Sequence, residues 1–450
     1  MNAFSRRGAC PALSAPMQTG DGLLVRLNPV AGGLSPKLLI GLAESALRHG
    51  NGIMEVTARG SLQIRGLMPA SAVLLAAEVD ALGIAVRTGM PVETGPLAGV
   101  DPMEIADPRP LAERIRAAVE EAGLPQRLGP KVSVVVDGGG QLTLDAVTAD
   151  VRLKAVRGGA GVLWTVSVAR DGQSAARLAS ADEDAARDIT VAALRMIAEK
   201  GREAHARDLS ERQLASLANW HSFAPPSVVG EMSGRAEGGA KECQSIGLFN
   251  LAASKVAPGI GLPYGSMPAG KIIDLVQRAL ALGTTEIRLA PGRSLLFLGQ
   301  PADACPSLPQ AAATLGFITS PADPRTRIAA CPGTPACASG QIATRDIAEK
   351  VAAENADILD FTLHISGCAK GCAHPGAAAL TLVGGENGAG LVVNATAKAL
   401  PAGYRPRYDA ARGIGRVAAA IRSARLPGET AAACLKRLGA AGVAEAYQQE

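Results

Sequence analysis

Two segments that lie far apart in the chain share a pattern of apolar residues at helical spacing. Residues 34–66 and residues 267–299 each begin with leucine, isoleucine, valine or alanine at every third or fourth position, which predicts an amphipathic helix. Each helix is predicted to end at a glycine, Gly50 or Gly283, in the left-handed conformation of a C-cap. Two short strands separated by a glycine-containing turn are then predicted in each segment, at residues 53–57 and 62–65 and at residues 286–289 and 294–298.

The two segments align as an internal repeat. Without a gap, eight of the 33 aligned positions are identical, and the shared pattern of apolar positions is stronger evidence than this count. A strand is predicted before each helix as well, at residues 22–27 and, more weakly, at residues 260–263. Strand–helix–strand–strand is about half of a ferredoxin-like sandwich. We therefore predict that two ferredoxin-like half-domain repeats pair into one pseudo-symmetric unit.

A similar order of elements follows each repeat. A helix at residues 111–121 and a valine-rich strand at residues 132–137 follow the first, and a helix near residues 342–354 and a strand at residues 360–365 follow the second. The predicted fold class is α+β, with the two half-domain repeats and two α/β domains. The predicted parts are residues 1–90, 91–240, 241–310 and 311–450, with joints near residues 89–102 and 225–240 and one or two closing helices beyond residue 401.

Composition and charge narrow the class of protein. The chain has 450 residues, 48% hydrophobic and 19% charged, so it is long enough for two to four domains and is not predicted to be disordered. A net charge of +4, with only two Trp, four Tyr and six Phe, argues against nucleic-acid binding. No long apolar run predicts a membrane span, and no apolar segment follows the N-terminal arginines, so we expect a cytoplasmic protein.

Four of the eight cysteines are grouped in the last predicted domain. Cys331 and Cys337 have the spacing C-x5-C, and Cys368 and Cys372 have the spacing C-x3-C, in segments rich in glycine and proline. Neighbouring thiolates repel one another unless a cation binds them. A [4Fe–4S] cluster, a zinc ion and four unrelated buried thiols are the interpretations that this spacing leaves open. The other cysteines show no pairing in their spacing and are expected to be free thiols: Cys10, Cys243, Cys305 and Cys434.

The cysteine motif resembles the cluster-binding signature of the sirohaem-dependent nitrite and sulfite reductases. Residues 364–372 read HISGCAKGC, and the C-x5-C pair precedes them. Residues 25–66 resemble the ferredoxin-like half domain of that superfamily. Within the superfamily, the chain is most similar to the precorrin-3B synthase family of aerobic cobalamin synthesis. The segments that carry this similarity are RGACP at residues 7–11, MQTGDGLLVR at residues 17–26, PLAGVDP at residues 96–102 and GCAHP at residues 371–375.

The resemblance implies a cofactor and a set of ligands. Cys331, Cys337, Cys368 and Cys372 would bind a [4Fe–4S] cluster. In the sirohaem reductases the last of these cysteines bridges the cluster to the tetrapyrrole iron, so Cys372 is expected to face a tetrapyrrole pocket. Arg59 matches the arginine with which that family binds a tetrapyrrole carboxylate.

Substrate-binding residues are predicted around the first repeat's second strand. Arg59, Gln63 and Arg65 alternate in sequence, so a strand would present all three on one face. Guanidinium groups suit the bidentate binding of carboxylates, which a tetrapyrrole carries in number. A solvated strand face is the alternative interpretation. Arg293, beside the position equivalent to Arg59 in the second repeat, is a further candidate.

Two of the cations that the reductases place above the haem are missing here. Only Lys131 remains of two lysines in their pattern, with Ser133 in the other place, and residues 90–92 read MPV where they carry Arg-Asn-Val. Lys370, inside the C-x3-C loop, would supply a replacement charge unless it is simply solvated. These departures disfavour the six-electron reduction of a small anion.

The synthase resemblance implies precorrin-3A and O2 as substrates. A hydroxyl group is placed on a meso carbon and a side-chain acetate closes a lactone, which gives precorrin-3B. The reaction implies an NADH-linked or ferredoxin-like reductase as electron donor, and either a mononuclear non-haem iron or sirohaem beside the cluster. His364 and His374 are candidate ligands of such an iron, with a structural role as the alternative. The competing functions are a sirohaem-dependent nitrite or sulfite reductase and a non-catalytic tetrapyrrole-binding protein.

Overall fold

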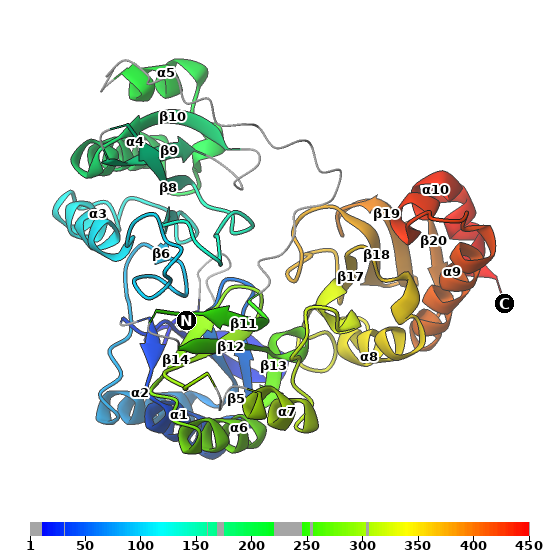
Figure 1. Cartoon of the computed structure of the whole chain (residues 1–450). Coiled ribbons are helices and arrows are strands. Elements are labelled where there is room, and N and C mark those ends of the chain that lie inside the picture. The colour runs from blue at the N-terminus through cyan, green and yellow to red at the C-terminus, as the bar shows by residue number, and fades with distance from the viewer. Residues whose placement is uncertain are drawn as a thin grey trace.

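The computed structural model describes residues 11–30, 32–159, 161–168, 175–219, 245–252, 255–302 and 306–449. In this part of the chain, helices and four five-stranded sheets form three lobes, which confirms the predicted mixed α+β character (Figure 1). The predicted joint at residues 225–240 lies outside the described residues, as do Cys10, Cys243 and Cys305.

The first repeat forms a sheet with the strand order β1-β2-β5-β4-β13. β2 (Gly22–Leu27) has its predicted bounds, and β4 (Ile53–Val56) and β5 (Leu62–Leu67) lie within two residues of theirs. The sheet also contains β1 (Met17–Thr19), and the repeat's helices are α1 (Pro36–His49) and α2 (Pro69–Ala81).

The second repeat forms a sheet with the order β11-β12-β15-β14-β3. Each sheet takes one strand from the other repeat, because β13 (Ser266–Pro268) pairs with β4 and β3 (Gly33–Leu34) pairs with β14. Leu42 on α1 and Val276 on α6 lie in one hydrophobic core that contains residues of both repeats. The remaining elements of the second repeat are β11 (Gly247–Asn250), β12 (Val256–Gly261), β14 (Glu286–Ala290), β15 (Ser294–Leu298), α6 (Ala269–Ala281) and α7 (Ser307–Thr314).

The two predicted glycine caps differ in the structure. Gly283 has a φ of +88° and is left-handed as predicted. Gly50 has a φ of −111°, so the prediction of a left-handed cap there is wrong. A side chain at this position would collide with the carbonyl oxygen of Arg65 on β5. Gly50 is therefore required for close approach of the helix end to the sheet rather than for its backbone conformation.

The middle lobe contains a sheet with the order β10-β9-β8-β7-β6, in which β6, β7 and β8 are parallel and β8, β9 and β10 antiparallel. The predicted helix and valine-rich strand are present as α3 (Arg109–Glu121) and β7 (Val134–Asp137). The elements that the sequence pattern did not predict are β6 (Val92–Thr94), β8 (Val151–Gly158), β9 (Gly161–Val168), β10 (Ala176–Ala181), α4 (Glu183–Lys200) and α5 (Glu211–Asn219).

The last lobe repeats this topology with the order β16-β17-β18-β19-β20, three parallel strands followed by two antiparallel ones. The predicted strand at residues 360–365 begins later, because the Asp360 carboxylate instead accepts hydrogen bonds from the first N–H groups of α10. The expected closing helices are α9 (Ala410–Ala424) and α10 (Ala431–Gln448). The other elements are β16 (Ile328–Ala330), α8 (Thr344–Glu354), β17 (Leu363–Ser366), β18 (Ala378–Gly385), β19 (Gly388–Ala395) and β20 (Gly403–Arg405).

Figure 1 shows how the three lobes are arranged. Helices α1, α2, α6 and α7 cover one side of the unit built from both repeats, the middle lobe stands on the opposite side, and the last lobe lies beside the unit. Strands of the repeats therefore lie between their own helices and the middle lobe. No helix in the described residues is long and apolar enough to cross a membrane.

Candidate functional site

Two neighbouring parallel strands bring the cysteine loops to one edge of the last sheet. β16 ends directly before Cys331, and β17 ends two residues before Cys368. In the pairing of these strands, Ala330 lies opposite Ile365. The backbone N–H of Gly367 donates a hydrogen bond to Cys331 Sγ at 3.1 Å. The parallel pairing therefore joins the C-x5-C loop to the C-x3-C loop.

The four thiols interact with one another. Cys331 is buried, Cys337 and Cys368 are half-buried, and Cys372 reaches the surface. Desolvation and then the thiols of Cys331, Cys368 and Cys337 raise the pKa of the Cys372 thiol, whereas the charge of Lys370 lowers it. Four thiolates at this site would repel one another, so the arrangement favours a bound cationic group.

Close backbone packing holds the two loops together. A Cβ atom on Gly367 would lie 3.2 Å from the Cα atoms of Gly333 and Gly340. Gly20, between β1 and β2 of the first repeat, packs on the other side of the C-x5-C loop, where a Cβ atom would lie 2.6 Å from the Pro335 carbonyl oxygen. Only glycine allows these approaches. The C-x5-C loop is thus held between the C-x3-C loop and the first repeat.

This donor set fits a [4Fe–4S] cluster. Four thiols meet at one sheet edge, and a backbone N–H group points at one of the sulfurs. Such a cluster is held by four cysteine thiolates and is tuned by hydrogen bonds to sulfur. Among the described residues, no three His, Cys, Asp or Glu side chains lie close enough together to hold a single metal ion.

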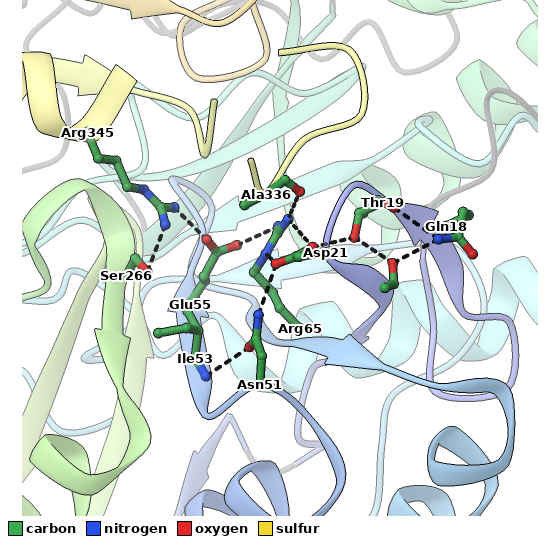
Figure 2. Close-up of polar contacts among 11 residues, drawn as sticks. Gln18, Thr19, Asp21, Asn51, Ile53, Glu55, Arg65, Ser266, Ala336 and Arg345 are labelled. Atoms are coloured by element: carbon green, nitrogen blue, oxygen red, sulfur yellow. Dashed lines mark hydrogen bonds and ion pairs between the residues drawn. The ribbon is translucent and has the colours of Figure 1, made fainter. Parts of the chain in front are cut away.

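Arg65 connects β5 to the C-x5-C loop (Figure 2). Its Nη2 donates a hydrogen bond to the carbonyl oxygen of Ala336 at 2.7 Å, one residue before Cys337. Its Nε and Nη2 donate to the two carboxylate oxygens of Asp21 at 3.0 and 2.9 Å, and Nη1 donates to Glu55 Oε2 at 3.3 Å. The residue is 4% exposed. With these donors occupied, Arg65 has little capacity left for a substrate carboxylate.

The carboxylates around Arg65 belong to a larger buried network. Burial raises the pKa of Asp21, but the Arg65 guanidinium and the Thr19 hydroxyl outweigh it and hold the pKa below its ordinary value. Glu55 also accepts a hydrogen bond from Arg345 on α8. The Arg345 guanidinium donates a second hydrogen bond to Ser266 Oγ at 3.0 Å. The network therefore joins strands of both repeats to the last lobe.

Gln63 is buried on the same strand and belongs to this network. In the amide orientation that satisfies both ends, its oxygen accepts from Arg26 Nη2 at 2.8 Å and its nitrogen donates to Glu55 Oε2 at 3.2 Å. Gln63 is 8% exposed. Its polar atoms are thus directed at protein groups.

Arg59 does not lie on the strand face predicted for it. β5 begins at Leu62, so Arg59 occupies the turn between β4 and β5, and the prediction that it shares a strand face with Gln63 and Arg65 is wrong. The turn points the guanidinium toward the middle lobe. There it donates to the Thr148 carbonyl oxygen at 2.7 Å, Glu93 Oε2 at 3.0 Å and Ser133 Oγ at 3.2 Å.

An open cavity lies between the repeats and the middle lobe. Arg59, Arg87, Arg109 and Arg288 all line it, with Glu93 as the acidic residue among the lining side chains. Burial and the neighbouring Arg116 lower the pKa of Arg87 below its ordinary value, although Glu93 and Glu113 oppose this. Sequence reasoning identified only Arg59 of these four arginines, because the others share no spacing or motif with it.

The three remaining predicted cations lie at different places. Lys131 is exposed in a turn before β7. Arg293, in the turn between β14 and β15, donates from Nη2 to the carbonyl oxygen of Ala373 at 3.0 Å, directly after Cys372. Lys370 donates from Nζ to Ser339 Oγ at 2.7 Å, which links the two cysteine loops. Two of the three are thus beside the thiols.

His364 and His374 pack edge to face, with ring centroids 5.7 Å apart. His364 is completely buried, and neither ring nitrogen has a hydrogen-bond partner in the described part of the chain. Burial, then the charges of His374 and Arg293, lower the pKa of His364 to about 4. Within the described part of the chain, His364 therefore does not make the hydrogen bonds expected of a structural histidine.

Comparison with known proteins identifies the family. The model of the nitrite/sulfite reductase ferredoxin-like half domain matches residues 15–82. A precorrin-3B synthase from Sinorhizobium sp is 39% identical over 449 residues, which cover 99% of this chain and 96% of that protein. The structure of the Mycobacterium tuberculosis NirA protein shares the fold, with a TM-score of 0.70 at 18% identity over 94% of this chain and 84% of that chain. The chain belongs to the precorrin-3B synthase family.

Proposed function

We propose that this chain converts precorrin-3A to precorrin-3B in aerobic cobalamin synthesis. One atom of O2 enters the substrate as a hydroxyl group on a meso carbon, and the other leaves as water with two electrons and two protons from the donor. A side-chain acetate closes the lactone. The observation that carries the proposal is the joint presence of four interacting thiols and an arginine-lined cavity on either side of β5.

The cysteine loops would hold a [4Fe–4S] cluster through Cys331, Cys337, Cys368 and Cys372. Bound there, the cluster would supply electrons one at a time to the reaction. A zinc ion would need four thiolates close enough together to bind one metal, and the described residues contain no such group. A cluster instead takes one thiolate on each of its irons. Arg293 and Lys370 place positive charge beside these loops, which would stabilise the added negative charge.

The arginines of the cavity would bind the carboxylates of the tetrapyrrole. Arg59 is the principal candidate, because its side chain is 37% exposed and its carboxylate partner Glu93 lies at the cavity wall. Arg87, Arg109 and Arg288 also line the cavity, but Arg109 is paired with Asp107 and Arg288 with Glu286. Guanidinium groups fixed by protein partners are already oriented for bidentate binding.

β5 supports the proposal that the two sites act together. Ser61, just before the strand, lines the cavity, and Arg65 on the strand binds the C-x5-C loop. β5 therefore connects the cavity to the loop that would hold the cluster.

Oxygen activation would need a second iron, either a mononuclear non-haem iron or sirohaem, and an NADH-linked or ferredoxin-like reductase as donor. His364 and His374 lie together, but no third His, Cys, Asp or Glu of the described residues completes a site for one metal ion with them. We therefore assign no ligands to a mononuclear iron. His364 is buried beside the cysteine loops, and its lowered pKa keeps its imidazole uncharged.

The test is turnover by the anaerobically purified chain with precorrin-3A, a reductant and 18O-labelled O2. We expect precorrin-3B carrying one labelled oxygen, detected by mass spectrometry, and consumption of one O2 for each product formed. Reduction of nitrite or sulfite with a viologen donor, without any reaction of precorrin-3A, would establish a sirohaem reductase instead. Binding of precorrin-3A without O2 consumption would establish a tetrapyrrole-binding protein.

A further inference from the structure

The two repeats present the same strand face to two different lobes. In the gapless alignment, residues 55, 63 and 65 correspond to residues 288, 296 and 298. The strand pairing confirms this correspondence, because β4 and β5 pair Glu55 with Gln63, and β14 and β15 pair Arg288 with Leu296. One structural position can therefore be compared in two surroundings within one molecule.

The second copy of this face has two leucines and one arginine, Arg288, whose Nη1 donates to the carbonyl oxygens of Pro96 and Ala98 at 3.3 and 3.0 Å. Leu296 and Leu298 pack in one cluster with Leu97 and Leu142 of the middle lobe. The first copy carries Gln63 and Arg65 at the same positions, buried with Glu55 against the last lobe. At the positions of Gln63 and Arg65, the second copy thus docks a lobe with leucine side chains.

The charge of Arg65, at a position that is Leu298 in the second copy, therefore needs another explanation. Burying ions costs free energy that their mutual attraction only partly returns, and apolar replacements are often as stable or more so. The leucines of the second copy show that such a replacement suits this fold. The difference between the two surroundings is the C-x5-C loop, which faces only the first copy.

Two donors fix the peptide before Cys337. The carbonyl oxygen of Ala336 accepts from Arg65 Nη2 at 2.7 Å and from the backbone N–H of Gly20 at 3.2 Å. On the other side of that peptide, the Cys337 N–H donates to the Gly333 carbonyl oxygen at 2.7 Å. The orientation of the Cys337 backbone is thus set partly by Arg65.

We propose that Arg65, held by Asp21 and Glu55, is a positioning residue for the cluster ligand Cys337 and that its charge raises the reduction potential of the bound cluster. The proposal rests on the cluster of the proposed function. Reduction adds a negative charge to the cluster, and a nearby guanidinium stabilises that state. Asp21 and Glu55 keep the guanidinium aimed at the loop (Figure 2).

The test compares the reconstituted wild-type chain with Arg65→Met. We expect the variant to lose iron to a chelator at least about fivefold faster, to have a more negative cluster potential and to show a changed electron paramagnetic resonance spectrum when reduced. Arg65→Lys, which keeps the charge, is expected to recover most of the potential. Arg345→Met is the matched control, because Arg345 binds Glu55 but does not contact the loop.

A second variant distinguishes an effect of the Arg65 charge from a failure of the chain to fold. Arg65→Met combined with Asp21→Asn and Glu55→Gln leaves no unpaired carboxylate around the missing guanidinium. It removes one positive and two negative charges, so its potential is expected to lie above that of Arg65→Met while the faster loss of iron remains. If Arg65 had only a structural role, the cluster potential of the triple variant would not lie above that of Arg65→Met.

The outcomes distinguish this proposal from the proposed function. A wild-type chain that takes up no iron or sulfide overturns the proposed function and this inference with it. A wild-type cluster whose potential, spectrum and rate of iron loss are unchanged in Arg65→Met, or changed equally by Arg345→Met, overturns only the role of Arg65.

Discussion

Arginine side chains of identical chemistry have different roles in this chain according to their partners. Arg65 is buried and binds two carboxylates and a loop carbonyl, so its charge is used inside the protein. Arg59 is partly exposed at a cavity wall and is paired with a single carboxylate, Glu93. A substrate carboxylate can compete for the second arginine but not for the first.

Replacing Arg59 by alanine is therefore expected to weaken precorrin-3A binding by about ten- to a hundredfold. A hydrogen bond between charged groups contributes about 1.5–3 kcal/mol, which corresponds to this range. The measurement is a spectroscopic titration of the purified chain with substrate. Arg212→Ala, at an exposed position on α5, is the control. A change smaller than about twofold in Arg59→Ala would contradict its role.

Glu104 gives the chain a pH-dependent stability. Burial raises its pKa from 4.5 to about 7, although the Gly99 N–H opposes this. The folded state thus favours the protonated carboxyl, so stability falls as the pH rises from about 4.5 to about 7 and the full penalty remains above that. Glu104→Gln keeps an acceptor for Gly99 and does not ionise. We expect its gain in melting temperature over the wild-type chain to be larger at pH 8 than at pH 5.

The exposed Glu121 on α3 provides the control substitution, Glu121→Gln. Equal changes in melting temperature at the two pH values for Glu104→Gln would show that the carboxyl is not held in its protonated form by the fold.

The sequence identified the thiols but not the residues that hold them. The two cysteine pairs are visible because each pair is local, six or four positions apart. Arg65 binds Ala336 across 271 positions and Asp21 across 44. No local pattern encodes such contacts. The even spacing of Arg59 and Arg65 suggested one strand face, but the turn before β5 separates them.

At the level of elements, the packing of neighbouring backbones decides where glycine is needed. Helix α9 contains two glycines, Gly413 and Gly415, two positions apart. A Cβ atom on Gly413 would collide with the buried ring of Tyr447 on α10 and lie 2.5 Å from Arg405 Cδ. A Cβ atom on Gly415 would meet nothing within 4 Å. One glycine is required by packing, and the other only weakens the helix.

Alanine substitutions at these two positions are expected to act in opposite directions. Gly415→Ala should stabilise the chain by about 0.5–1 kcal/mol, because glycine is the poorer residue inside a helix. Gly413→Ala should destabilise it by about 1–3 kcal/mol through overpacking. The measurement is the free energy of unfolding in urea, and each variant is the control for the other. Equal effects of the two substitutions would contradict the packing described for α9.

Helices and strands in which apolar residues recur at a clear period could be predicted from the sequence, and those with a weak period could not. Helices α1 and α6 and the strands after them carry clear apolar spacing, and β2 has its predicted bounds. The hairpin of β8 and β9 was not predicted, although inward and outward residues alternate along β9. The left-handed cap expected at Gly50 failed because a neighbouring strand, not the helix itself, requires glycine there.

On the scale of the whole molecule, one internal repeat serves two docking surfaces. The face of the second repeat holds the middle lobe through leucines and Arg288, and the face of the first repeat holds the loop that carries Cys337 through Arg65. Figure 1 shows the middle lobe opposite the helices of the repeats and the last lobe beside the repeats. The sequence revealed the repeat through its pattern, but the use of each face depends on contacts between segments far apart in the chain.

The most direct test of the account is the iron and acid-labile sulfide content of the anaerobically purified chain. We expect about four sulfide ions and at least about four iron atoms per chain. Cys368→Ser should lose most of both, while Cys434→Ala, which changes a buried thiol on α10 away from the loops, should retain them. Stoichiometric zinc without sulfide, or a wild-type chain that holds neither metal nor sulfide, would contradict the account.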